Sequence, residues 1–261
     1  MGDPSPDLIK RLRDFASAQK DVPDPRLAAW TIPGTVSDAR LALLATCLAQ
    51  DLTIPGVARL LKELHELLGD SLLEPWRLRQ EDLDKFCRIG WLDAWPHRED
   101  LPGWITAVGD FLRTYGDPSR WHDRWVQPRD FVRTMAMEIP WMGRKSTERV
   151  KGWRLARWLV RGEGSLAALW PESARALLVV PHPILSVPLE WFGQLPPGWE
   201  SKAPRDRQAW TDSVIRAIDP NDPAAVWTAL ESILRRGKTD HLCVERMGSC
   251  DRCPLKPLCK T

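Results

Sequence analysis

Residues 138–150 read EIPWMGRKSTERV, which joins the apolar end of one helical pattern to the start of the next. Gly143 permits a tight turn between the two patterns, and two basic residues follow it directly. Apolar residues recur at helical spacing on both sides, over 128–138 and 146–161. The segment therefore predicts two helices joined by a hairpin, with Lys145 at the start of the second helix.

Helical periodicity continues through most of the chain. SDARLALLATCLAQ (37–50) begins with polar capping residues, and IPGVARLLKELHELLGD (54–70) has a proline near its start and a glycine near its end. The best candidate for a strand, ALLVVPHPIL (176–185), contains two prolines, which disfavour a strand. An all-α fold is predicted, with further helices at 80–88, 102–115, 165–177, 207–218 and 222–236. Clusters of proline and glycine predict connections at 21–34, 116–128 and 194–204.

The composition is that of a globular protein. Of the 261 residues, 43% are hydrophobic and 28% are charged, so the chain can bury a large core. No apolar run approaches the roughly 18 residues that cross a bilayer, and the first residues lack the apolar core of a signal peptide. We therefore expect a cytoplasmic protein without membrane contact. The net charge of +2 excludes a polycation, so nucleic-acid binding has to depend on local charge.

Positive charge is concentrated in the second helix of the hairpin. Glu148 is the only acid between 144 and 161, a stretch with seven basic residues. Backbone N–H groups at a helix start can bind a phosphate, and Gly143 allows the close approach that this requires. Arg144 and Arg149 are therefore expected to contact DNA phosphates. The bases further along are more simply explained as a solvated helix face: Arg154, Arg157 and Arg161.

HLCVERMGSCDRCPLKPLC (241–259) holds four cysteines in a C-x6-C-x2-C-x5-C array. Thiolates so close together, in a chain without a secretion signal, indicate a metal site rather than disulfides. Tetrahedral zinc is one alternative, although structural zinc sites with four cysteines mostly use two C-x2-C pairs. An iron–sulfur cluster accepts uneven spacing and is favoured, with the ligands Cys243, Cys250, Cys253 and Cys259. Cys47 and Cys87 lie in apolar helical stretches and are expected in the core.

These segments resemble the helix-hairpin-helix DNA glycosylases of the endonuclease III type. The cysteine array is similar to the iron–sulfur cluster loop that closes that family, and IPWMGRK (139–145) resembles its hairpin, usually LPGVGRK. LLATCLAQDLT (43–53) resembles its early LLSAQATD helix, and RIGWL (88–92) its IGLY turn. WTALESILRRGKTDHLC (227–243) resembles the helix that precedes the cluster. The segments follow in the family's order, and the resemblance covers about residues 37–261.

The resemblance implies a two-lobed fold with DNA held between the lobes. A six-helix barrel lobe would run from 37 to 155 and end in the helix-hairpin-helix, and the cluster lobe would combine 1–36 with 156–261. The family's four cysteines hold a 4Fe–4S cluster, which implies the same cofactor here. The implied function is that of a monomeric enzyme of base excision repair, a DNA glycosylase and abasic-site lyase.

The resemblance also implies roles for single residues. Lys145 corresponds to the lysine that attacks C1′ of an extruded nucleotide and forms a Schiff base; an ordinary surface lysine is the alternative. Gln50 stands where the family fills the gap left by that nucleotide, and Trp91 where it probes the opposite strand. Of the bases that usually lie between the first two cysteines, only Arg246 remains.

The chain departs from the family at two positions that bear on activity. Trp141 replaces the first glycine of the hairpin, and Pro181 stands where the catalytic aspartate belongs, in a stretch (131–205) without any aspartate. His182 or Glu163 could supply the missing group, although a packing histidine and a solvated loop glutamate are simpler explanations. Loss of one electrostatic stabiliser typically costs about 10²–10³ in rate. The favoured expectation is slow lyase activity at abasic sites; the alternative is an impaired protein that only binds damaged DNA.

Overall fold

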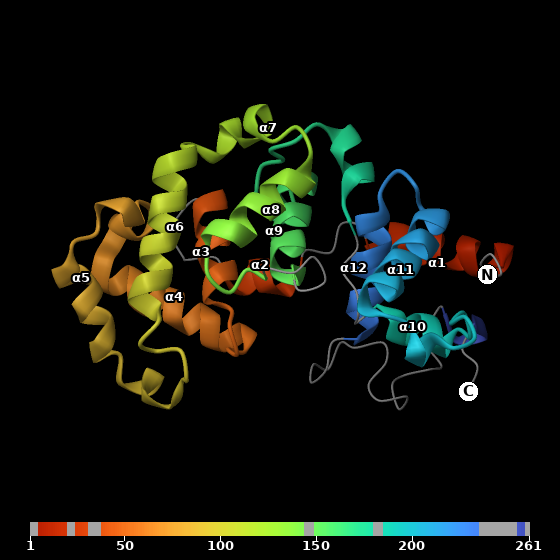
Figure 1. Cartoon of the computed structure of the whole chain (residues 1–261), viewed down its shortest axis with the longest axis horizontal. Coiled ribbons are helices and arrows are strands. Elements are labelled where there is room, and N and C mark those ends of the chain that lie inside the picture. Colours follow the sequence, from red (N-terminus) through yellow and green to blue (C-terminus); the bar gives the residue numbers. More distant parts are fainter. Residues whose placement is uncertain are drawn as a thin grey trace. The chain divides into compact units, whose positions relative to one another are not determined.

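The structure is a computed structural model that describes residues 5–19, 24–30, 38–143, 149–179, 185–234 and 255–258. Every regular element in these ranges is a helix, and none is a β-strand (Figure 1). The prediction of an all-α fold is thus confirmed for the described part of the chain. None of the helices in that part is both long and apolar enough to cross a membrane.

The chain divides into two compact units. The first, which we call the hairpin unit, is Pro23–Pro171. The second, the terminal unit, combines Met1–Val22 with Glu172–Thr261.

The bounds of these units differ from those expected for the lobes. The expected boundary at 155 lies inside α9 (Val150–Arg161), which packs against both α3 (Ala39–Leu48) and α8 (Pro128–Glu138). Gly152 makes the approach to α8 close, because a Cβ atom there would lie 3.0 Å from side-chain atoms of Val132 and Met135. The whole of α9 is therefore part of the hairpin unit.

The hairpin unit is built around α3, whose residues from Leu41 to Leu48 are all buried. Asp38 caps this helix by accepting a hydrogen bond from the backbone N–H of Arg40 at 2.7 Å. α3 packs against α4, α6 and α9, so its apolar side chains are covered on several sides. The other α-helices of the unit are α2 (Pro25–Ala29), α4 (Ile54–Leu68), α5 (Gln80–Asp84), α6 (Leu101–Tyr115) and α7 (Trp121–Arg124). Its 3-10 helices are η1 (Gly69–Leu73), η2 (Pro75–Arg77), η3 (Lys85–Arg88), η4 (Gly90–Ala94) and η5 (Pro118–Arg120).

The terminal unit brings a helix from the first residues of the chain against helices from its last third. Its N-terminal helix α1 (Pro6–Gln19) packs against α11 (Pro204–Ile218) and α12 (Pro223–Leu234), as Figure 1 shows. Arg13 fixes this packing by donating two hydrogen bonds to the carbonyl of Ile218, from Nε at 2.8 Å and Nη2 at 2.5 Å. The remaining elements are η7 (Glu172–Leu177), α10 (Ser186–Trp191), η8 (Trp199–Ser201) and η10 (Lys256–Leu258).

One predicted helix, at 165–177, does not form. The chain is irregular up to Pro171 and then forms only the 3-10 helix η7. Leu166 and Trp170 are buried, as their helical spacing suggests, but the indole N–H of Trp170 reaches the carbonyl of Trp125 at 2.7 Å. Burial here comes from a folded-back loop and not from a helix face.

Four α-helices were not expected from the sequence: α1, α2, α7 and α10. α2 lies within the proline-rich stretch 21–34, which predicted a connection. Asp24 starts this helix by accepting a hydrogen bond from the backbone N–H of Arg26 at 2.9 Å, and Pro25 occupies the first helical position.

Candidate functional site

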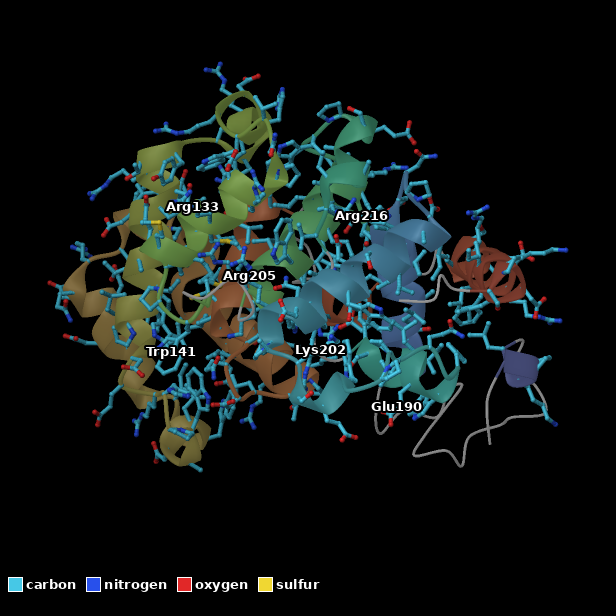
Figure 2. All side chains as sticks on the ribbon, turned by 45° about the vertical axis from the view of Figure 1, so that its right-hand side comes forward. Arg133, Trp141, Glu190, Lys202, Arg205 and Arg216 are labelled. Atoms are coloured by element: carbon cyan, nitrogen blue, oxygen red, sulfur yellow. The ribbon has the colours of Figure 1, made fainter. Side chains whose placement is uncertain are left out.

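The turn that follows α8 is held by two buried residues. Ile139 and Met142 are 1% and 0% exposed, whereas Trp141 between them is 51% exposed (Figure 2). The backbone φ angles are 64° at Trp141 and 87° at Gly143. Trp141 therefore adopts a backbone conformation that favours glycine. The helix-hairpin-helix family that the sequence resembles has a glycine at this position.

Lys151 lies in the first turn of α9 and is partly buried. Its Nζ donates a hydrogen bond to Oε1 of Gln50 at 3.0 Å, across 101 positions of the sequence. Burial lowers the pKa of Lys151 to about 8, and the cation of Arg154 acts in the same direction. A substantial fraction of this amine is therefore uncharged at a pH where an ordinary lysine is almost fully protonated.

Gln50 connects this amine to a carboxylate and an imidazole. Its Nε2 donates to Oδ2 of Asp51 at 3.2 Å, and the same oxygen lies 3.0 Å from Nε2 of His97. The hydrogen bond with His97 holds the pKa of Asp51 below its usual range, with a smaller contribution from Gln50. Asp51 has a φ angle of 54°, so a second residue of this region holds a backbone conformation that is rare outside glycine.

Aromatic rings surround the imidazole. The ring centroid of His97 lies 5.0 Å from that of Trp141, 5.5 Å from Trp104 and 5.9 Å from Trp95. The indole N–H of Trp95 donates to the backbone carbonyl of Gln50 at 2.9 Å, which fixes the segment directly after α3. His97 is consequently enclosed, with 15% of its side chain exposed, while Trp141 is half-exposed to solvent.

We call Gln50, Asp51, His97, Trp141 and Lys151 the Gln50 cluster. It joins the end of α3, the segment between η4 and α6, the turn after α8 and the first turn of α9. The cluster holds an amine, a carboxylate–imidazole pair and an exposed aromatic ring. Such a set can attack a carbonyl carbon, move a proton and stack a flat ring. Two non-glycine residues with strained backbone in one place are typical of a functional site.

Two other predicted DNA contacts within the described part of the chain, Trp91 and Arg149, are not members of this cluster. Trp91 is fixed against α4, where its indole N–H donates to Oε2 of Glu63 at 2.7 Å and its ring lies 4.6 Å from the guanidinium of Arg59. Arg149 stands at the N-terminal cap of α9 and donates from Nε to the carbonyl of Gly143 at 3.4 Å. Arg149 thus contacts the turn at Gly143, and Trp91 does not join the Gln50 cluster.

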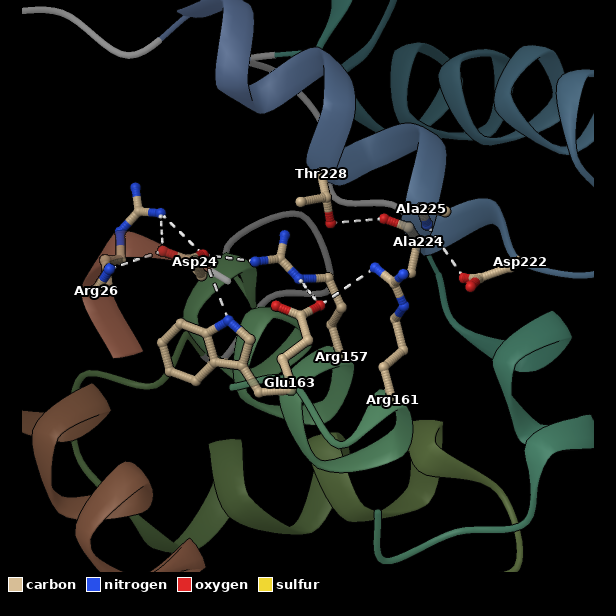
Figure 3. Close-up of polar contacts among 10 residues, drawn as sticks. Asp24, Arg26, Arg157, Arg161, Glu163, Asp222, Ala224, Ala225 and Thr228 are labelled. Atoms are coloured by element: carbon tan, nitrogen blue, oxygen red, sulfur yellow. Dashed lines mark hydrogen bonds and ion pairs between the residues drawn. The ribbon is translucent and has the colours of Figure 1, made fainter. Parts of the chain in front are cut away.

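Glu163 belongs to a buried ion cluster instead of a solvated loop (Figure 3). Its Oε1 lies 3.1 Å from Nε of Arg157 and 3.3 Å from Nη1 of Arg161. Arg157 also donates to Asp24 at 2.5 Å, and both of these side chains are 0% exposed. The expectation of a solvated basic face is therefore wrong for Arg157 and for Arg161, whose side chain is only 8% exposed. These ion pairs give Glu163 a structural role, because they hold its carboxylate inside the fold.

Several predicted site residues lie outside the described residues, and their contacts are not described. They are Arg144, Lys145, His182, Arg246, Cys243, Cys250, Cys253 and Cys259. Within the described ranges no group of three or more His, Cys, Asp or Glu is placed to hold a metal ion, a finding that does not concern these four cysteines. Of the two remaining cysteines, Cys47 is buried in α3, as predicted.

The sequence alone does not identify most members of the Gln50 cluster as site residues. Asp51 directly follows Gln50, and Lys151 belongs to the basic stretch, so both had a local signal. His97 stands in WPHRED without any helical or motif context, and nothing in the sequence marks it. Comparison of the chain with models of protein families, with curated proteins and with solved structures finds no match.

Proposed function

We propose that this protein is a DNA repair enzyme of the helix-hairpin-helix, endonuclease III type, acting as a DNA glycosylase and abasic-site lyase through Schiff-base chemistry. The observation that carries the proposal is the link between α3 and the hairpin. Gln50, expected to enter the DNA where a nucleotide leaves it, is hydrogen-bonded to a lysine in the first turn of the helix that follows the hairpin turn. An extruded abasic sugar would meet an amine at that place.

The turn after α8 supports DNA binding. Ile139 and Met142 anchor it, and Gly143, which has a positive φ angle, has no side chain that would hinder the approach of a phosphate. Arg149 contacts the same turn from the start of α9. Binding would be strongly salt-dependent, because it replaces counterions on the DNA backbone.

Lys145 is the amine that this proposal places at C1′ of the extruded nucleotide. The glycosylase step on intact bases would be slow, because Pro181 occupies the position of the expected aspartate. At an abasic site no base has to leave, so the lyase step remains. The proposal includes a two-lobed fold. It also includes a 4Fe–4S cluster, which would hold the C-terminal loop and be bound by Cys243, Cys250, Cys253 and Cys259.

The test is trapping with borohydride on a duplex that carries one abasic site. Wild-type protein is expected to form a covalent adduct, and Lys145→Gln to lose most of it. Lys62→Gln, an exposed lysine of α4, is the matched control and should trap as the wild type does. Iron analysis and visible absorbance of the same preparation check the cluster, and zinc in place of iron would contradict that part.

A second function, binding of damaged DNA without turnover, is favoured by Trp141. A half-exposed indole can stack on an unpaired base without any reaction. Tight binding to abasic DNA without an adduct in the wild-type protein would select this function over the first. Loss of that binding in Trp141→Ala would identify the stacking residue.

A further inference from the structure

Lys151 differs from the lysines on the surface of the hairpin unit. Lys62 is exposed and Lys85 is partly buried, and each faces a carboxylate, at 3.8 Å in Glu66 and 2.8 Å in Asp82. Lys151 is partly buried, and its hydrogen-bond partner is the neutral amide of Gln50. Buried ammonium groups are normally paired with an opposite charge. This pairing therefore needs an explanation other than structural compensation.

Burial and the neighbouring cation of Arg154 favour the free amine of Lys151, and the carboxylate of Asp51 opposes it. The start of α9 places the positive end of the helix dipole at the ammonium, and Arg154 follows one turn later on the same helix. Cys47 of α3 is fully buried, which raises the pKa of its thiol to about 12, so it supplies no negative charge at neutral pH. The opposing group is Asp51, whose carboxylate is already bound to His97 and Gln50.

We propose that Lys151 is a reactive amine of the Gln50 cluster, a second nucleophile that forms a Schiff base with an aldehyde. The identity of the aldehyde, the ring-opened sugar of an abasic site, rests on the proposed function. The reactivity of the amine does not, since it follows from burial, the helix start and the neutral partner. Oε1 of Gln50 orients the amine by accepting a hydrogen bond from one of its N–H groups, and the lone pair of the uncharged amine remains free for attack.

The reaction balances without any added oxidant or reductant. The Nζ lone pair forms a bond to C1′, and loss of water from the resulting carbinolamine gives the imine. A proton then leaves C2′ for water, and the C3′–O bond breaks, so that the 3′ phosphate departs with the electron pair. Hydrolysis of the imine returns the amine and releases the unsaturated aldehyde.

The first experiment uses no DNA. The full-length protein is treated briefly with formaldehyde and cyanoborohydride at a series of pH values, and peptide mass spectrometry follows the methylation of each lysine. Lys151 is expected to reach half of its maximal rate near pH 8, whereas an ordinary lysine, with a pKa of about 10.4, is still far from its maximum there. Lys62 is the internal reference. A profile of Lys151 that coincides with that of Lys62, or no labelling of Lys151, would overturn the proposal.

The second experiment maps the borohydride-trapped adduct on abasic DNA in four proteins: wild type, Lys145→Gln, Lys151→Gln and the double variant. An adduct on Lys151 that persists in Lys145→Gln and disappears in the double variant supports the proposal. Lys151→Arg keeps a donor to Gln50 but cannot form an imine, so it separates chemistry from a folding defect. Its adduct yield should match that of Lys151→Gln while its thermal unfolding matches the wild type.

The remaining outcomes separate this inference from the proposed function. An adduct on Lys145 alone, unchanged in both Lys151 variants, overturns the role of Lys151 and leaves the lyase function standing. No adduct in the wild type, together with labelling of Lys151 near pH 8 in the first experiment, overturns the lyase function and leaves the reactive amine standing.

Discussion

At the scale of single residues, the Gln50 cluster contains features that lower the stability of the folded protein. Asp51 and Trp141 hold φ angles of 54° and 64°, which residues other than glycine rarely adopt. Lys151 keeps a partly buried amine beside a neutral amide. By contrast, the buried charges of Asp24 and Arg157 face each other directly. Buried charges are thus paired with opposite charges at Asp24 and Arg157, whereas Lys151 in the Gln50 cluster is hydrogen-bonded to a neutral group. This difference is expected for a site that binds or reacts.

Lys151→Met is expected to stabilise the protein at neutral pH. Burial lowers the pKa of Lys151 from 10.5 to about 8, so between these two values the folded protein binds fewer protons than the unfolded chain. The contribution of Lys151 to stability therefore rises with pH across this range and is least favourable below pH 8. Replacement by Met should raise the free energy of unfolding by about 1–2 kcal/mol at pH 7.

Denaturant unfolding at pH 7, 8.5 and 10 measures this effect, which should shrink as the pH rises. The control is Lys62→Met on the exposed face of α4, for which a change within about 0.5 kcal/mol is expected at all three pH values. A loss of stability in Lys151→Met at pH 7 would show that the amine is compensated in the folded state.

At the scale of elements, the sequence predicts a helix well where one pattern specifies both its period and its ends. The prediction at 128–138 coincides with α8, because Pro128 is suited to the first helical turn and the apolar residues that follow keep a single face. The prediction at 165–177 was wrong, although Leu166 and Trp170 do have helical spacing. Their burial depends on Trp125, which local periodicity cannot reveal.

The same limit applies to the site. Gln50 could be proposed from its surrounding motif, but its partner Lys151 lies 101 positions away. The contact arises because α3 and α9 pack side by side, which no local pattern specifies. His97 reaches Asp51 across 46 positions from a segment without regular secondary structure. Sequence therefore identified one member of a cluster whose chemistry is created by tertiary packing.

The turn after α8 provides a test at this scale. Trp141→Gly is expected to change the free energy of unfolding by no more than about 1 kcal/mol. Relief of backbone strain, worth about 1–3 kcal/mol, offsets the lost ring contacts with His97 and Trp104, each worth about 0.5–1.5 kcal/mol. Trp141→Val loses the contacts and places a β-branched residue at positive φ, so it should be less stable than the glycine variant by about 2 kcal/mol. Urea denaturation compares the two, and equal stability would mean that the φ angle of 64° is not retained.

At the scale of the whole molecule, the two proposed sites lie in different units. The Gln50 cluster lies entirely in the hairpin unit, and the four cysteines lie within the residue range of the terminal unit. The terminal unit also depends on both ends of the chain, because α1 packs on α11 and α12. Loss of the proposed cluster should consequently affect the terminal unit first, with the contacts among Gln50, Asp51 and Lys151 retained.

A pair of leucine substitutions tests whether the two units are separate in stability. Leu12 of α1 and Leu43 of α3 are 1% and 0% exposed, and truncation of such a residue to Ala costs about 2–5 kcal/mol. Leu12→Ala should reduce the hydrogen-exchange protection of α11 and α12, the helices that α1 contacts, while α4 and α6 keep theirs. Leu43→Ala should reduce the protection of α4 and α6 and leave that of α11 and α12 unchanged, since α3 is the central helix of the hairpin unit.

Hydrogen exchange followed by mass spectrometry resolves the two patterns. An equal loss of protection in both units, in either variant, would mean that the chain unfolds as one cooperative body, and the Gln50 cluster would then not survive damage to the terminal unit.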